Sequence, residues 1–304
     1  MSVISSFPAM PNRIAIACEY IFSLGVDGGR RDEILKNLSP LSGGDGEDDN
    51  EVASSGKTMA HSVIDEMENL ELVLINENSN LILAKDFLSA KKTSSDWQSL
   101  LQPILRERLT DSSRASQFRQ DDVGDALSWF LSQDPFKPIA KSRQHADFLR
   151  EQLKESDPLL ITIGNDSRFQ NLLYWARYLG FSEWISIGDN DLAIPDPTRA
   201  INYYLPTIFQ AQKSLAIGEF VSRLAKACGI FEGGPIRQEL EQRLKSAIRE
   251  ERHFSRSTSL GLARLENQGL ILLKKESDAG SWILDLGKEQ MPITSIDYLA
   301  KARK

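Results

Sequence analysis

Residues 67–74 read MENLELVL and residues 265–272 read LENQGLIL, so one junction occurs twice in a chain of 304 residues. In both copies, the polar end of a predicted helix leads directly into a short apolar run. Gly269 fits the left-handed residue that often ends a helix before a strand. An internal similarity of this kind indicates a repeated structural unit.

The N-terminal junction joins a helical pattern to a hairpin pattern. Residues 57–70 place Met59, Val63, Ile64, Met67 and Leu70 at helical spacing. The apolar runs 72–75 and 81–84 then flank a polar turn at 76–80, which is typical of a β-hairpin. Two further helices are predicted upstream, over residues 13–24 and 30–38.

The C-terminal junction has the same surroundings. Residues 257–268 carry Leu260, Leu262 and Leu265 in helical phase, and the apolar runs 270–273 and 282–284 flank a polar segment. Upstream helices are predicted over residues 220–227 and 235–251. Three helices followed by a hairpin is the order of a winged helix, whose third helix usually reads DNA.

A third copy is predicted between these two, although it lacks their shared letters. Residues 167–180 have a helical pattern, and the apolar runs 184–187 and 192–194 flank a turn. Its upstream helices are expected at 124–131 and 143–153. The predicted fold class is mainly α with small β-hairpins (α+β), arranged as tandem winged-helix units, two outer and one central.

These units predict three domains. They are an N-terminal winged helix over residues 1–90, a central helical or winged-helix-like domain over 96–212, and a C-terminal winged helix over 213–304. The acidic, glycine-rich segment 39–55 is expected to be a loop within the first unit. Residues 89–95 mark the boundary before the central domain.

Composition favours an ordinary globular protein. The chain is 41% hydrophobic and 26% charged, which excludes disorder throughout. A formal net charge of −7 argues against coating nucleic acid with the whole surface, but allows a local basic patch. The sequence shows neither a membrane-spanning apolar run nor a secretory signal, so a cytoplasmic protein with buried, reduced Cys18 and Cys228 is expected.

The motifs in the sequence give little support for catalysis or cofactor binding. Residues 56–58 (GKT) match the end of a phosphate-binding loop, but Glu51 stands where that motif needs its first glycine. The histidines His61, His145 and His253 lack the spacing of metal ligands. We therefore expect no enzyme activity, no cofactor and no metal site.

The aromatic set of the central unit has two interpretations. Aromatic side chains beside a predicted helix could stack on nucleobases, but their helical spacing next to leucines favours a place in the core. The set consists of Trp175, Tyr178, Phe181 and Trp184.

The outer units differ in the charge of the helix that would read DNA. In the N-terminal unit, Lys57 and His61 are followed by carboxylates that would repel phosphates, so this acidic face is expected to bind other protein subunits. These carboxylates are Asp65, Glu66, Glu68 and Glu71.

In the C-terminal unit, cations and hydroxyl groups gather at the start of the predicted reader helix and on the wing, where they could contact double-stranded DNA. The predicted DNA-binding residues are Arg249, Arg252, His253, Arg256, Ser257, Thr258, Ser259, Arg264, Lys274 and Lys275. The alternative is a solvated helix whose cations are balanced by neighbouring glutamates.

Three stretches carry a resemblance to a known family: WFLSQDP (129–135), WARYLGF (175–181) and PDPTRAI (195–201). With outer winged helices around such a middle region, the chain resembles the DpdG-type accessory proteins of bacterial phage-defence islands, which install and police deazaguanine-modified DNA. The resemblance implies a restriction-side or targeting subunit without chemistry of its own, and it supplies no binding residues.

Three interpretations of the function stay open at this point. The first is a non-catalytic DNA-binding adaptor of an anti-phage modification and restriction complex. The second is a kite-type winged-helix subunit that bridges an SMC-like ATPase complex, and the third is a ligand-responsive transcription regulator. An enzyme has the weakest support of the classes considered.

Overall fold

The computed structural model describes residues 2–6, 8–39, 49–85, 87, 96–111, 117–118, 120–141, 145–188, 190–247, 249–275 and 280–299, with the backbone alone for 49–58. The chain divides into two compact units. The N-terminal unit comprises Met1–Leu109 and Arg114–Asp121, and the C-terminal unit comprises Thr110–Ser113 and Asp122–Lys304.

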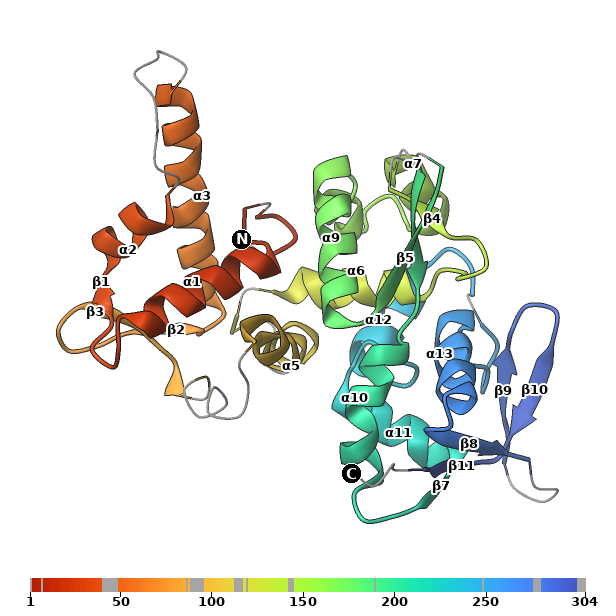
Figure 1. Cartoon of the computed structure of the whole chain (residues 1–304). Helices are drawn as coiled ribbons and strands as arrows, with labels where there is room; N and C mark the ends of the chain where they lie inside the picture. Colours follow the sequence, from red (N-terminus) through yellow and green to blue (C-terminus); the bar gives the residue numbers. More distant parts are fainter. Residues whose placement is uncertain are drawn as a thin grey trace. The chain divides into compact units, whose positions relative to one another are not determined.

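The N-terminal unit packs helices against a small antiparallel sheet (Figure 1). Its elements are α1 (Pro11–Ser23), β1 (Gly29–Arg30), α2 (Arg31–Leu38), α3 (Asp49–Asn69), β2 (Val73–Ile75) and β3 (Asn80–Leu83), followed by α5 (Trp97–Thr110). The strand order is β1-β3-β2, so the third strand lies in the middle. Ile14, Ile64 and Met67 are fully buried and form part of the core.

A glycine turn sets the path from α1 into this sheet. Gly28 has a φ of +63°, and a Cβ at this position would lie 2.0 Å from the carbonyl oxygen of Leu81. Only glycine allows such a close approach to β3 without displacing the backbone. The next residue, Gly29, pairs with Leu81 and so begins the first strand of the sheet.

The first part of the C-terminal unit repeats this order of elements. It consists of α6 (Asp121–Leu131), β4 (Ile139–Ala140), α7 (His145–Gln152), α8 (Pro158–Thr162), α9 (Asp166–Leu179), β5 (Ser182–Ile187) and β6 (Asn190–Pro195). The sheet order is β4-β6-β5. Asn165 caps α9 by accepting a hydrogen bond from the amide of Arg168, and Gly180 ends the helix in the left-handed conformation.

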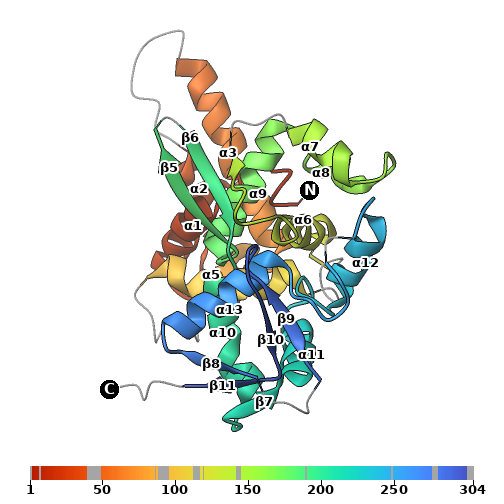
Figure 2. The same ribbon diagram turned by 90° about the vertical axis from the view of Figure 1, so that its right-hand side faces the viewer.

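The second part repeats the order once more. Its elements are α10 (Thr198–Phe209), β7 (Ser214–Ala216), α11 (Ile217–Ala227), α12 (Pro235–Arg243), α13 (Arg256–Asn267), β8 (Ile271–Lys274) and β11 (Ser295–Tyr298). The sheet order is β7-β11-β8, again with the last strand in the middle. A separate hairpin of β9 (Trp282–Asp285) and β10 (Gln290–Ile293) is inserted between β8 and β11 (Figure 2).

All three modules therefore share one connectivity, and the mainly helical α+β prediction is confirmed. We call them the N-terminal module (α1 to β3), the middle module (α6 to β6) and the C-terminal module (α10 to β11). The predicted domain limits stay a prediction. However, α10 lies before the predicted boundary at residue 212 and packs against α11 and α13 of the C-terminal module.

Three local predictions were wrong. Residues 270–273 and 282–284 do not pair with each other, because β8 pairs with β11 while β9 pairs with β10. The helix predicted over 235–251 ends at Arg243. Of the predicted loop 39–55, residues 49–55 belong to α3, while residues 40–48 lie outside the described residues, as does the whole of the predicted linker 89–95.

Two expectations from the sequence concerned membrane-spanning helices and the burial of the cysteines. Within the described ranges, every helix is too short or too polar to cross a bilayer. Cys18 and Cys228 are both buried, as expected from their apolar surroundings.

Candidate nucleic-acid interface

The start of α13 lies inside the C-terminal unit rather than on its surface. Ser257, Thr258 and Ser259 are buried. The Ser257 hydroxyl donates to the carbonyl of Leu131, and the Thr258 hydroxyl lies 2.9 Å from a carboxylate oxygen of Glu232. These three hydroxyl residues were predicted to contact phosphates, and that prediction is wrong for this structure because their side chains are used in packing α13.

Arg256 is tied to two carboxylates. Its guanidinium lies 2.5 Å from Asp134 and 3.1 Å from Asp285. Hydrogen bonds to Asp285 and Asp134 raise the pKa of Arg256 above its ordinary value. Two negative partners leave this cation little attraction for a phosphate, although 39% of its side chain is exposed.

Arg249 belongs to a second ion-pair network. It holds Glu241 through two hydrogen bonds of 2.8 and 3.0 Å, and Glu241 also accepts a bond of 3.1 Å from Arg237. Arg237 is fully buried and lies 3.6 Å from the equally buried Glu232. This network stabilises the segment between α12 and α13, so Arg249 has a structural role.

The other predicted cations are divided between paired and exposed positions. Arg264 pairs with Asp196, and Lys274 lies 2.6 Å from Asp297. His253 is partly buried, with its ring 3.8 Å from Glu250. Arg252 and Lys275 are exposed. Neither takes part in an ion pair within the described part of the chain. The alternative stated for this helix, cations balanced by acidic neighbours, thus describes most of the predicted site.

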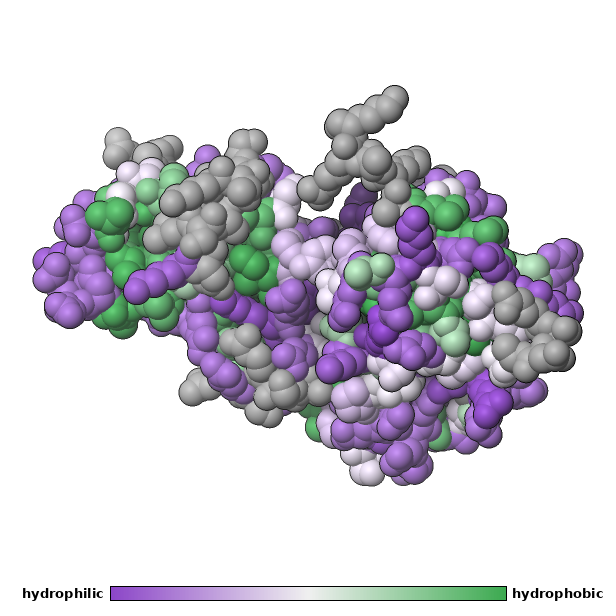
Figure 3. Space-filling view, turned by 90° about the horizontal axis from the view of Figure 1, so that it is seen from below, coloured by the Kyte–Doolittle hydropathy of each residue, from purple (hydrophilic) through white to green (hydrophobic). Residues whose placement is uncertain are grey.

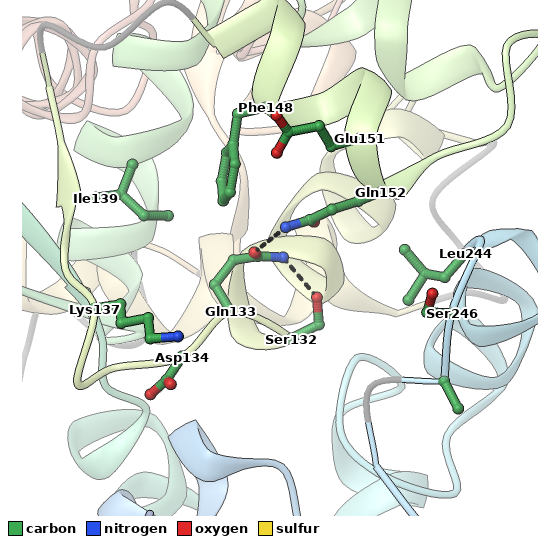
Figure 4. A pocket seen from close by; sticks show the side chains of 11 residues that line it. Ser132, Gln133, Asp134, Lys137, Ile139, Phe148, Glu151, Gln152, Leu244 and Ser246 are labelled. Carbon is green, nitrogen blue, oxygen red and sulfur yellow. Dashed lines mark hydrogen bonds between the residues drawn. The ribbon is translucent and has the colours of Figure 1, made fainter.

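A pocket of about 400 Å³ with a mixed polar and apolar lining opens beside this region (Figure 4). Gln133 lies between Ser132 and Gln152 and hydrogen-bonds to both at 2.8 Å. Gln152 in turn accepts a 2.8 Å hydrogen bond from the indole of Trp129. The amides are satisfied by one another, so the network fixes α6 against α7, and Phe148 and Lys137 form other parts of the wall.

The middle module carries a surface that the sequence analysis did not find. Tyr174 and Arg177 project from α9, Trp184 lies on β5, and Lys141 follows β4. The rings of Tyr174 and Trp184 are 4.9 Å apart. The Lys141 ammonium lies 3.9 Å, and the Arg177 guanidinium 4.7 Å, from the centre of the Trp184 ring. Figures 1 and 2 show α9 beside the β5–β6 hairpin that carries this surface.

The predicted aromatic core is confirmed in part. Trp175 and Phe181 are fully buried, as their helical spacing indicated. Trp184 is only partly buried and lies under the two cations instead. No local sequence signal separates Trp184 from the buried aromatic residues, because Lys141 reaches it only through the pairing of β4 with β6 and of β6 with β5.

The N-terminal unit has a different surface. Nearly all of the formal net charge of −7 falls on this unit. On α3, Asp65 and Glu68 are held by Arg31 at 2.5 and 3.3 Å, while Glu66 is buried. The side chain of Lys57 lies outside the described residues. This helix therefore presents carboxylates.

Hydrophobic side chains also reach the surface of the N-terminal unit (Figure 3, green). The large exposed ones are Ile16, Phe22, Leu24, Val26, Leu74 and Ile75. Apolar residues gathered at a surface mark sites of protein contact more often than sites of DNA contact.

Within the ranges that the structure describes, no group of His, Cys, Asp and Glu side chains is placed to hold a metal ion.

Comparison with known proteins gives one match. A family model described as DpdG-like matches residues 1–279, which is most of the chain and ends before β9. Neither the curated proteins nor the solved structures contain a match.

Proposed function

Because the chain belongs to the DpdG-like family, we propose that it is a DNA-binding adaptor subunit, without catalysis of its own, of a bacterial anti-phage complex that modifies and restricts DNA. The DNA in question carries deazaguanine bases, as the family resemblance implies. The adaptor holds DNA through the C-terminal unit and other protein subunits through the N-terminal unit.

One observation carries this proposal: three modules share the order helix, strand, helix, helix, hairpin, with the last strand in the middle of the sheet. In the middle and C-terminal modules, an extra helix is added within that order, and in the C-terminal module β9 and β10 are inserted between the two paired strands β8 and β11. We interpret the modules as winged helices, a variant of the helix-turn-helix. Such modules bind DNA or protein through surface complementarity and need no catalytic groups.

The division of charge supports the assignment of the two units. The acidic N-terminal unit would be repelled by phosphates, and its exposed apolar side chains suit a protein partner. The C-terminal unit is close to neutral, so a local cationic surface on it can attract DNA.

The test uses fluorescence anisotropy of labelled duplex DNA with the purified full chain at two salt concentrations. We expect binding that weakens steeply as salt rises, because phosphate contacts release counterions. Failure to bind any duplex at low salt would overturn the DNA-binding part of the proposal. Incubation of the same duplex with Mg²⁺ or Mn²⁺ should leave the DNA uncut and unmodified.

The partner assignment has its own test. A tagged chain is purified from cells that contain a deazaguanine modification system, beside an Asp65→Lys/Glu68→Lys variant. We expect the wild-type chain to retain proteins of that system and the variant to lose them. Retention of a large coiled-coil ATPase instead would indicate a subunit that bridges such an ATPase.

A further inference from the structure

We infer that the middle module, through the outer face of α9 and the β5–β6 hairpin, is the part of this chain that contacts the duplex DNA backbone. This inference rests on the proposed DNA-binding function and gives it a site. It moves the interface away from α13, where the sequence predicted it.

The exposed face of α9 has the side chains that such contacts need. Gln170, Tyr174 and Arg177 are spaced four and three residues apart, so they lie on one face of the helix. Tyr174 and Arg177 are exposed and Gln170 is partly exposed. The face thus offers amide, hydroxyl and guanidinium donors, which are the groups that bind phosphates and base edges.

Arg177 is available to an anion. Its guanidinium lies over the Trp184 ring at 4.7 Å, and it forms no ion pair with a carboxylate in the part of the chain that the structure describes. A cation over an indole keeps its charge and its outward hydrogen-bond donors while losing some freedom of movement. Arg177 is therefore ordered before a phosphate arrives, which lowers the entropic cost of the contact.

The neighbouring carboxylates cancel this charge only in part. Asp191 is held by Lys141 at 3.0 Å and by the Ser186 hydroxyl at 2.6 Å, and these bonds lower its pKa. Glu183 is held by Arg199 at 2.9 Å. Glu183 and Asp191 each have a basic partner, although Asp191 also feels the charge of Arg177. Asp166 in the first turn of α9 adds an exposed carboxylate, so the positive charge of Arg177 is balanced only in part.

The corresponding helices of the other two modules do not offer this surface. On α3, the described side chains include no lysine or arginine, and Asp65 and Glu68 are held by Arg31. On α13, the first turn is buried and Arg256 is held by two carboxylates. Of the three helices that precede a hairpin, α9 alone combines exposure with a cation that lacks an acidic partner among the residues described.

The tip of the hairpin has a second feature that suits DNA. Ile187 is 61% exposed, and Ile185 on the same strand is also exposed. An apolar side chain at the end of a wing can pack on deoxyribose or between base edges in the minor groove.

The test measures duplex binding by the full chain and by Arg177→Ala and Arg177→Glu variants, with Arg150→Ala as the matched control. Arg150 is an exposed arginine on α7 that pairs with Asp147 at 3.1 Å. We expect Arg177→Ala to weaken binding about tenfold at low salt, and Arg177→Glu to weaken it further. Arg150→Ala should bind like the wild type.

The salt dependence distinguishes a lost phosphate contact from a disturbed fold. Loss of one contact lowers the slope of log K against log salt by about one. Thermal unfolding of each variant checks that its fold is unchanged. Equal binding by the wild type and both Arg177 variants would overturn this inference and leave the proposed function standing. Absence of binding by the wild type would instead overturn the proposed function.

Discussion

The guanidinium carbon of Arg177 lies 4.7 Å from the centre of the Trp184 ring. Lys141 approaches the same ring at 3.9 Å, so two cations from separate elements share one indole. The indole positions the exposed Arg177 at the surface of the middle module, while Lys141 is mostly buried and paired with Asp191.

Trp184→Leu should weaken duplex binding about two- to fivefold, because an exposed cation–π contact is worth about 0.5–1 kcal/mol. The salt slope should stay the same, since Arg177 and Lys141 keep their charge. Anisotropy titrations at several salt concentrations measure both quantities. Unchanged affinity would mean that the ring does not order the cations for binding.

Arg256→Ala should lower the stability of the C-terminal unit by about 1 kcal/mol and leave DNA affinity unchanged. The variant leaves Asp134 and Asp285 without their cation. Solvent screens these partly exposed ion pairs, which limits the loss of stability. Urea unfolding and anisotropy test the two halves of this statement. Arg252→Ala is the control, because Arg252 is exposed and has no ion pair in the described ranges, and it should be as stable as the wild type. A large loss of DNA affinity in Arg256→Ala alone would restore α13 as the interface.

Glu232 should make the C-terminal unit sensitive to acid. Burial alone would raise its pKa, but the charge of Arg237 and hydrogen bonds from Ser255 outweigh burial and hold the pKa below its ordinary value. Since the folded-state pKa is depressed, the carboxylate stabilises the fold above its unfolded-state pKa, and this stability is lost as pH falls through the folded-state pKa.

Glu232→Gln should cost about 3 kcal/mol near neutral pH, because it leaves the buried Arg237 without one of its charged partners. It should also flatten the fall of unfolding free energy with decreasing pH below about 4.5. Urea titrations across a pH series measure both effects. Glu239→Gln is the control, because Glu239 is 72% exposed on α12. Parallel pH curves for wild type and Glu232→Gln would contradict the assignment.

Gly28→Ala should destabilise the N-terminal unit more than Gly25→Ala. Both glycines have positive φ, at +63° and +83°, so each substitution costs about 1 kcal/mol of backbone strain. A Cβ at Gly28 would also meet the carbonyl of Leu81, whereas nothing lies within 4 Å at Gly25. Chemical unfolding of the two variants should differ by about 2 kcal/mol or more. Equal losses of stability in the two variants would show that the backbone near β3 shifts easily to accommodate the added Cβ.

Local sequence patterns predicted the elements that local forces determine. The helix of residues 166–179 and its hairpin follow from apolar spacing, from the cap at Asn165 and from the left-handed Gly180. The pairing of β8 with β11 was missed because an apolar strand, β9, stands nearer in sequence and has an equally suitable pattern. Strand choice depends on the whole sheet, which short-range patterns do not specify.

The functional residues were predicted less well, because charge is visible in a sequence and neutralisation is not. Asp134 lies 122 residues before Arg256, and no spacing rule connects them. The same applies to Lys141, which reaches Trp184 only because β4 pairs with β6 and β6 pairs with β5. The helix that binds DNA is therefore better identified once the acidic partners of each cation are known.

The place of β11 has a consequence for how the protein is made. β11 is the middle strand of its sheet, yet it leaves the ribosome after both of its neighbours, β7 and β8. Until it arrives, the growing chain exposes two unpaired strand edges, which invite pairing with other chains. The N-terminal module completes its sheet within the first 83 residues and can fold early in translation. The C-terminal module must wait for its last strand, so nascent chains stalled before residue 295 are the ones most exposed to aggregation.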